Sequence, residues 1–276
     1  VDSITDAFSS TPVLAMIPSG FKTSNSASIL PNDGTGDFTV VRNSSKKRMN
    51  SSGLIETLGV NVIAPDYTDA GCPVIKTEPQ STNLITYSNN FSNWSSSNTS
   101  VTVSYATSPD GLNNAWKITA SSASNSYLYR GYNSTNNLTH TRSIWAKTVS
   151  GTGTTSLCAY HGNSNSVFTI TPNWQRFEVT GYSGIGAGSL YAVDFRGGNL
   201  TEIILWEAQS ENLNGGAATS NITTNASTAT RFADVVSVNT ASITGTISSI
   251  TETIDGVDQT PITTIPANYT MPVGNI

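Results

Sequence analysis

Short apolar and aromatic runs, separated by loops rich in Gly, Asn and Ser, follow one another between residues 81 and 212. In several runs apolar and polar positions alternate, so that one face of a strand packs inward while the other meets solvent. Closely spaced short strands of this kind are typical of an antiparallel sandwich or barrel. The pattern predicts nine strands, at residues 101–105, 115–119, 127–132, 143–149, 154–160, 167–170, 175–180, 189–195 and 202–208.

The alternation also predicts which side chains form the core. In the run 191–195, Tyr191, Val193 and Phe195 share one face, and Ala192 and Asp194 share the other. The residues that we expect inside the sandwich are Trp116, Ile118, Ile144, Trp145, Phe177, Val193, Leu205 and Trp206.

The stretches 1–80 and 213–276 hold fewer and weaker strand signals. In the first we expect strands at 38–41, 54–56 and 60–63, a hairpin loop at 50–53 and a helical turn near 2–8. In the second, the composition of 214–218 predicts a linker, followed by a strand at 233–238 and an extended arm. The predicted fold is all-β: an antiparallel jelly-roll sandwich at 81–212, flanked by extended β-rich N- and C-terminal arms at 1–80 and 213–276.

Composition supports sheet and loops over helix. Charged residues make up 11% of the chain and hydrophobic residues 37%, and small polar residues fill the difference. The chain keeps 5 Trp, 10 Tyr and 8 Phe, enough aromatic side chains for a β core. The arms have too few clustered apolar residues to fold alone, so we expect at least one arm to contact another subunit.

Charge and cysteine content exclude several classes of protein. The net charge is -5, and the basic run Lys46, Lys47 and Arg48 reads as a solvated hairpin tip, so we expect no nucleic-acid partner. No apolar run approaches the length of a membrane-spanning helix, so we expect no membrane insertion. Cys72 and Cys158 are far apart in sequence; a disulfide and two buried thiols both stay open, with the thiols favoured.

Several segments resemble bacteriophage virion proteins that carry a jelly roll of the carbohydrate-binding-module type. The similarity begins at Thr77–Ser88 (TEPQSTNLITYS) and continues at Asn90–Trp94 (NFSNW). It then covers the segments SPDG at 108–111, AWKIT at 115–119, NWQRF at 173–177, LWEAQSE at 205–211 and TRFAD at 230–234. These motifs specify architecture well and ligand poorly.

The resemblance implies a structural protein of the particle surface, located on the virion as a tail fibre, spike or decoration protein. Its partners would be other virion proteins and further copies of itself, with a homotrimer as the leading expectation, and it would serve host attachment if it binds a host surface glycan. Two alternatives stay open. One is a secreted bacterial adhesin or carbohydrate-binding module, and the other is a polysaccharide-degrading enzyme.

The sequence lacks a constellation that favours catalysis. His140 and His161 are the chain's 2 histidines, and Asp194, Glu202 and Glu207 fall on separate late strands without forming an evident acid pair. Neither a zinc-type cysteine spacing nor a glycine-rich phosphate loop before a helix occurs. We therefore expect no enzyme activity, no metal and no cofactor.

Aromatic residues on strands and loops are the candidates for glycan binding, because sugar faces stack on rings and planar polar groups fix hydroxyls. One predicted strand carries Tyr127, Tyr129 and Tyr132 together with Arg130; Tyr127 and Tyr129 share one face, and Arg130 points to the opposite face. The further candidates are Tyr160 with its neighbour His161, and Trp94 in a loop, which is read equally well as a core residue. Core packing with hydroxyls at the rim is the alternative for the tyrosines.

Overall fold

The computed structural model describes residues 12–275 except 23–24, 31–35, 69–71, 123–124, 135–138, 160–165, 183–185 and 214–215. The chain forms two compact units. Unit 1 consists of residues 1–80 together with 232–276, and unit 2 is the continuous stretch Ser81–Arg231. The stretch 213–276, which the sequence analysis treats as one arm, is thus divided between the two units.

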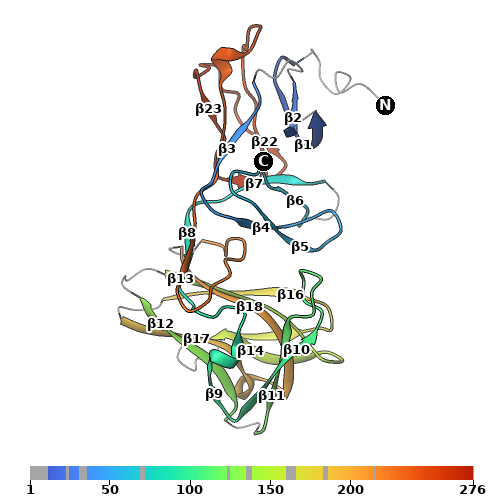
Figure 1. Ribbon diagram of the computed structural model, residues 1–276, viewed down its shortest axis with the longest axis vertical. Coiled ribbons are helices and arrows are strands. Elements are labelled where there is room, and N and C mark those ends of the chain that lie inside the picture. The colour runs from blue at the N-terminus through green and yellow to red at the C-terminus, as the bar shows by residue number, and fades with distance from the viewer. Residues whose placement is uncertain are drawn as a thin grey trace. The chain divides into compact units, whose positions relative to one another are not determined.

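Unit 2 is a sandwich of two five-stranded sheets, in which neighbouring strands are antiparallel (Figure 1). The first sheet has the order β10 (Thr99–Ala106), β11 (Ala115–Ala120), β18 (Glu202–Asn212), β13 (Thr139–Lys147), β16 (Gln175–Tyr182). The second has the order β15 (Val167–Ile170), β14 (Gly153–Ala159), β17 (Gly186–Asp194), β12 (Tyr127–Ser134), β9 (Ser95–Ser97). All nine predicted strands are present, and β9 is an addition, so the predicted jelly-roll sandwich is confirmed.

One apolar cluster fills the space between the two sheets. Ile118, Ile144 and Leu205 come from the first sheet, Leu128 and Val193 from the second, and each is fully buried. Burial of such side chains is the main favourable term in folding, at roughly 25 cal/mol per Å² of apolar surface. The alternation therefore identified most of the core correctly.

Trp145 is an exception to the predicted core. It is half-buried on the outer face of the first sheet, where its ring packs against Trp206 at 6.5 Å between centroids. Its indole N–H donates to Asn221 Oδ1 at 3.0 Å. Residues 216–228 cover this part of the outer face, and Gln209 accepts a hydrogen bond from the backbone N–H of Ile222 at 2.6 Å. A second buried layer thus lies outside the sheet, which strand alternation alone does not predict.

The segment that carries the resemblance enters unit 2 through β8 (Ser81–Asn83), which pairs with β19 (Ala229–Arg231). Asn83 is fully buried, donates to the carbonyls of Ala208 and Ile222, and accepts from the N–H groups of Ile85 and Ser210. Its side chain joins three separate segments of the chain. This structural task explains why the motif specifies architecture.

Unit 1 is a set of small sheets. Its strands are β1 (Ala15–Lys22), β2 (Asn25–Leu30), β3 (Thr39–Val41), β4 (Lys46–Met49), β5 (Ile55–Leu58), β6 (Pro65–Asp66), β7 (Val74–Thr77), β20 (Val235–Val238), β21 (Thr253–Ile254), β22 (Val257–Asp258), β23 (Tyr269–Thr270) and β24 (Gly274–Asn275). Strand β3 pairs with β20, and β7 pairs with β24, so the N-terminal and C-terminal segments share sheets. The predicted arms therefore fold together into one unit.

The predicted loop at 50–53 is confirmed as the turn between β4 and β5, with Gly53 at a φ of 74°. The expectation that the basic run before this loop is a solvated hairpin tip is wrong for Lys46. This residue begins β4 and is buried at 2% exposure. Residues 60–63 form no strand, and the turn expected near residues 2–8 lies outside the described residues.

A buried charge cluster links distant segments of unit 1. Asp234 accepts from Arg42 Nη1 and from Lys46 Nζ, each at 2.7 Å, and Lys46 also lies 3.2 Å from a carboxylate oxygen of Glu78. The backbone N–H of Glu78 donates to Asp234 as well, at 2.9 Å. All four side chains are at most 5% exposed. Buried charges persist only when paired in this way.

Helix is limited to short 3-10 turns in the part of the chain that the structure describes, for example Phe91–Asn93. None of its helices has the length and apolar content needed to cross a membrane. Cys72 is exposed, Cys158 is buried, and both are free thiols, so the prediction of two buried thiols holds for one of them. Burial raises the pKa of the Cys158 thiol to about 12.

Candidate functional site

Three tyrosine rings gather on the outer face of the second sheet of unit 2. Tyr127 and Tyr129 come from β12 and Tyr191 from β17, where Tyr129 and Tyr191 are direct partners across the strands. The ring centroids lie 5.2 Å apart for Tyr129 and Tyr191, 5.4 Å for Tyr127 and Tyr191, and 5.9 Å for Tyr127 and Tyr129. The rings are half-buried, so each keeps part of its surface open to solvent. We call these residues the tyrosine cluster.

A β-bulge places Tyr191 in the cluster. Leu128 pairs with Val193, but the next residue, Tyr129, pairs with Tyr191, so Ala192 is an extra residue on β17. Ala192 and Val193 are both fully buried, and Tyr191 turns outward. The expectation that Tyr191 shares a face with Val193 is therefore wrong, because a bulge interrupts strand alternation.

An ion pair closes one end of the tyrosine cluster. Asp194, the direct partner of Tyr127, accepts from Arg196 Nε at 2.8 Å and from Nη2 at 2.6 Å. The Arg196 guanidinium lies 4.5 Å from the centre of the Tyr127 ring. Partial burial raises the pKa of the Tyr191 phenol, and the neighbouring Tyr127 adds to this effect, while Arg196 opposes it. Tyr191 is thus a neutral hydroxyl near pH 7, able to donate and accept hydrogen bonds.

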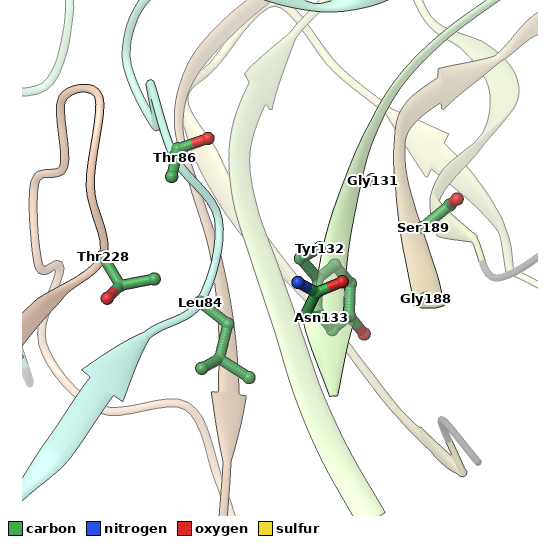
Figure 2. Close-up of a pocket in the computed structure, with 8 residues that line it drawn as sticks. All are labelled: Leu84, Thr86, Gly131, Tyr132, Asn133, Gly188, Ser189 and Thr228. Atoms are coloured by element: carbon green, nitrogen blue, oxygen red, sulfur yellow. The ribbon is translucent and has the colours of Figure 1, made fainter. Parts of the chain in front are cut away.

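A pocket of about 430 Å³ lies farther along β12 and β17, beside residues 131–133 and 188–189. Figure 2 shows Leu84, Thr86 and Thr228 on one side, with the residues of β12 and β17 on the other. Gly131 and Ser189 are direct partners and lie two residues beyond Tyr129 and Tyr191 on the same outward face. Thr86, which lines the pocket, accepts hydrogen bonds from Arg130 on the opposite face of β12. The residues that line the pocket are Leu84, Thr86, Gly131, Tyr132, Asn133, Gly188, Ser189 and Thr228.

Arg130 lies outside the tyrosine cluster, on the opposite face of β12, as strand geometry predicts. Its guanidinium donates to Thr86 Oγ1 from Nε at 3.0 Å and to the carbonyl of Asn93 from Nη1 at 2.6 Å, and it lies 5.1 Å from the Tyr87 ring centre. These bonds attach the loop at 86–93 to the strand. We therefore assign Arg130 a structural role beside the pocket.

Trp94 is part of the core and offers no ring face to a ligand. It is 6% exposed, packs against Phe91 at 5.0 Å between ring centroids, and donates its indole N–H to the carbonyl of Tyr87 at 2.9 Å. Tyr160 and His161, the two other candidates, lie outside the described residues. Tyr132 is 6% exposed and part of the core, so of the predicted set the structure brings Tyr127 and Tyr129 together.

Sequence reasoning missed Tyr191, Asp194 and Arg196 as members of the site. The sequence shows that two runs carry tyrosines on alternate positions. The pairing register of β12 with β17 is needed to place Tyr191 opposite Tyr129. A bulge changes that register by one residue. Only the paired strands identify the neighbours.

The acids considered for catalysis are each bonded to another side chain, and the histidine is buried. Asp194 is paired with Arg196, Glu202 lies 3.4 Å from Lys117 Nζ, and Glu207 accepts from Thr223 Oγ1 at 2.6 Å. His140 is buried inside the sandwich, where burial, with a smaller contribution from Arg142, lowers its pKa to about 4. The described residues contain no group of three or more His, Cys, Asp or Glu side chains arranged to hold a metal ion.

Comparison with known proteins gives matches to solved structures. No family model matches the chain, and no curated protein matches it. The chain is similar to the CBM22-1 xylan-binding domain of Paenibacillus barcinonensis Xyn10C, with 14% identity, a TM-score of 0.34, and coverage of 50% of this chain and 94% of that domain.

Two further matches are to parts of longer proteins. For the CBM22-1 and GH10 modules of Clostridium thermocellum xylanase 10B, identity is 13% and the TM-score 0.32, with 46% of this chain and 27% of that chain covered. For tailspike protein 4 of bacteriophage CBA120, identity is 11% and the TM-score 0.30, with 46% and 21% covered. The chain therefore spans about a quarter of the length of these two proteins. The first structure is named as a xylan-binding domain, the second as a CBM22-1 module together with a GH10 module, and the third as the enzymatically active domain of a tailspike protein.

Proposed function

We propose that unit 2 binds a glycan through the tyrosine cluster. The observation that carries the proposal is the stacked pair Tyr129 and Tyr191, with centroids 5.2 Å apart and an interplanar angle of 23° on the outward face of a sheet. Tyrosine rings present an apolar surface with a hydroxyl at its edge. The C–H face of a sugar ring stacks on such a surface, and the phenol hydroxyls meet sugar hydroxyls.

The surroundings of the rings support an elongated ligand. The Asp194–Arg196 pair supplies fixed polar groups at one end of the cluster, and a pocket lies farther along the same two strands. From Tyr127 to Asn133 the strand runs for roughly 20 Å, at about 3.4 Å per residue. A pocket with a few placed polar groups beside an apolar platform is the usual form of a small-ligand site.

A shallow, half-buried platform predicts weak binding at a single site, on the order of millimolar to micromolar. Display of many copies on one object multiplies the effective affinity without new contacts. The proposed site therefore suits a protein that is presented in several copies.

We further propose that the chain binds its glycan without cleaving it. The carboxylates of Asp194, Glu202 and Glu207 are bonded to Arg196, Lys117 and Thr223, in that order, and His140 is enclosed in the sandwich. No assay of glycan turnover should therefore respond to Glu202→Gln. Hydrolysis that disappears in this variant would overturn the proposal.

Titration of the full chain against a panel of neutral oligosaccharides tests the glycan site. Tyr191→Ala should weaken the best binder of the panel at least about tenfold, because a stacking surface is lost. Phe232→Ala is the matched control, since Phe232 is an aromatic residue that is 45% exposed in unit 1. Equal affinity in Tyr191→Ala and in the wild-type chain would falsify the site.

The second candidate is a structural protein of a virion surface. Binding of a host glycan by this protein would then serve attachment of the particle to the host. Its support is the sequence resemblance, whose motif residues Glu78 and Asn83 occupy buried structural positions. The expected partners are other virion proteins and further copies of the chain, with a homotrimer favoured. Immunogold labelling of phage particles together with light scattering of the pure chain tests this. Unlabelled particles and a monomeric chain would favour the adhesin or module alternative.

A further inference from the structure

Two lysines stand side by side on the outer face of the first sheet of unit 2. Lys117 of β11 and Lys147 of β13 are both direct partners of Ile204 on β18, which runs between them. Their inward-facing neighbours Ile118 and Ala146 are fully buried in the core, so the lysines point outward. Two strand spacings separate their Cα atoms by about 10 Å.

Each lysine is accompanied by an aromatic ring. Lys117 Nζ lies 4.5 Å from the centre of the Tyr105 ring, and Lys147 Nζ lies 5.2 Å from that of Trp174. Tyr105 is 41% exposed. The Trp174 indole N–H donates to the carbonyl of Thr107 at 3.0 Å, which fixes the orientation of the ring. We call these four residues the lysine–aromatic surface.

A bulge in the edge strand β10 brings Tyr105 to this surface. The pairing of β10 with β11 moves from Thr102 opposite Lys117 to Ala106 opposite Ala115, so three residues of β10 face one residue of β11. Ser104 within the bulge has a φ of 51°, in the left-handed region that few non-glycine residues adopt. Local strain of this kind is concentrated at binding and catalytic sites.

The charges at this surface are unevenly balanced. Glu202 lies 3.4 Å from Lys117 Nζ and neutralises part of its charge. Among the described residues, no carboxylate lies within ion-pair distance of Lys147. The surface therefore carries a net positive charge within a chain whose net charge is -5, and an anion is attracted to this place rather than to the chain as a whole.

We propose that the lysine–aromatic surface is a second binding site, specific for a sugar that carries a carboxylate. The carboxylate would lie beside the Lys147 ammonium and toward Lys117, and the sugar ring would stack on Trp174 or Tyr105. An ammonium–carboxylate contact supplies the charge selection, and the ring supplies the sugar contact. This site is separate from the tyrosine cluster, on the other sheet, and does not require that cluster to bind.

A pair of ligands that differ only in charge tests the proposal. The full chain is titrated with oligogalacturonate and with its methyl ester, which has the same sugars but no charge. We expect oligogalacturonate to bind at least about tenfold more tightly than the ester. The difference should shrink as the salt rises from about 50 mM to about 500 mM, because exposed charges are then screened. Equal affinity for the two ligands, or no binding of oligogalacturonate, overturns the proposal.

Variants of one lysine locate the site. Lys147→Met removes the charge and keeps the aliphatic stem, so oligogalacturonate should bind about tenfold more weakly, whereas Lys147→Arg should keep most of the affinity. Lys47→Met, on β4 of unit 1, is the matched control and should bind normally. Unchanged affinity in Lys147→Met overturns the site.

A direct reading comes from the Trp174 indole N–H resonance of the wild-type chain, which should shift during titration with oligogalacturonate. A resonance that stays fixed at saturation overturns the placement.

A single-stranded DNA oligonucleotide serves as the competing polyanion with stacking bases. If it binds more tightly than oligogalacturonate, the assignment to acidic sugars is wrong. Loss of neutral-sugar binding in Tyr191→Ala with oligogalacturonate binding intact would show the two sites to be independent.

Discussion

The interior of unit 1 and the interior of unit 2 are stabilised by different kinds of interaction. In unit 2, twenty buried apolar or weakly polar side chains form one cluster between the sheets. The corresponding cluster in the described part of unit 1 has three members, Val238, Ile243 and Tyr269. Unit 1 instead encloses Arg42, Lys46, Glu78 and Asp234 as a network of ions.

This difference predicts different responses to damage. Apolar burial is non-directional and spread over many side chains, so that losing one member leaves the rest in place. A buried ion network has few members, and removal of one leaves the others charged and unpaired in a poorly solvated place. Unit 1 should therefore depend on single residues to a greater degree than unit 2.

The largest effect is expected for Asp234→Ala. Arg42 and Lys46 would remain buried without their shared carboxylate, which should lower the free energy of unfolding by about 3–5 kcal/mol. Hydrogen exchange should increase in β3 and β20 and leave the jelly roll unchanged. Asp258→Ala is the control, because Asp258 is exposed and bonds only the nearby Thr253 hydroxyl among the contacts that the structure shows. Normal protection of β3 and β20 would contradict the role given to the network.

Truncation in the core of unit 2 should come next in size. Ile144→Ala removes a fully buried side chain, which should lower the free energy of unfolding by about 2–5 kcal/mol through lost transfer energy and a residual cavity. Denaturant unfolding followed by tryptophan fluorescence measures this. Val103→Ala, at a position 59% exposed, is the control and should change little. If Ile144→Ala lowers the free energy of unfolding no more than Val103→Ala does, the sandwich repacks freely around the truncated side chain.

Acid should weaken unit 2 through His140. The folded-state pKa is about 4, below the ordinary value of 6.5, so the unfolded chain binds the proton first. The free energy of unfolding then has its full value above about pH 6.5. It declines by up to roughly 3 kcal/mol as the pH falls toward 4. Unfolding of the wild-type chain and of His140→Gln across this window measures the difference. An equal decline in the two proteins would assign it to other groups.

The smallest effect is expected for a partly exposed ion pair of unit 1. Arg48 Nη2 and Glu56 Oε1 are 2.6 Å apart, with side chains that are 17% and 37% exposed. Glu56→Gln should lower the free energy of unfolding by at most about 1 kcal/mol, since water screens the pair. Comparison with Asp234→Ala in the same assay separates the effect of burial from that of charge. A loss as large as that of Asp234→Ala would contradict this distinction.

Strand positions in unit 2 were predictable from the sequence because each strand has one face against a single core. The run around Ile118 alternates apolar and polar positions, the run around Leu205 is apolar at four successive residues, and all nine predicted strands are present. Trp145 was misplaced because residues 216–228 pack on the outside of its strand. A residue covered from the outer side has the same sequence pattern as one that faces the core.

The candidate site was only partly predictable. Tyr127 and Tyr129 are two residues apart on one strand, so their shared face follows from local geometry. Tyr191 joins them through a register that depends on one bulge residue, and no local signal marks Ala192 as extra. Lys46 was misread for a similar reason, since its partner Asp234 is 188 residues away in the sequence.

The pairing of Ser81 with Arg231 has a mechanical consequence. Tension along the chain enters the jelly roll at one of these residues and leaves at the other, which lie side by side at the same end of β8 and β19. Pulling them apart would load the short ladder one bond at a time, in the manner of a zipper. The sandwich would carry force only after that ladder has opened. The β8–β19 pairing therefore protects the jelly roll from tension applied along the chain.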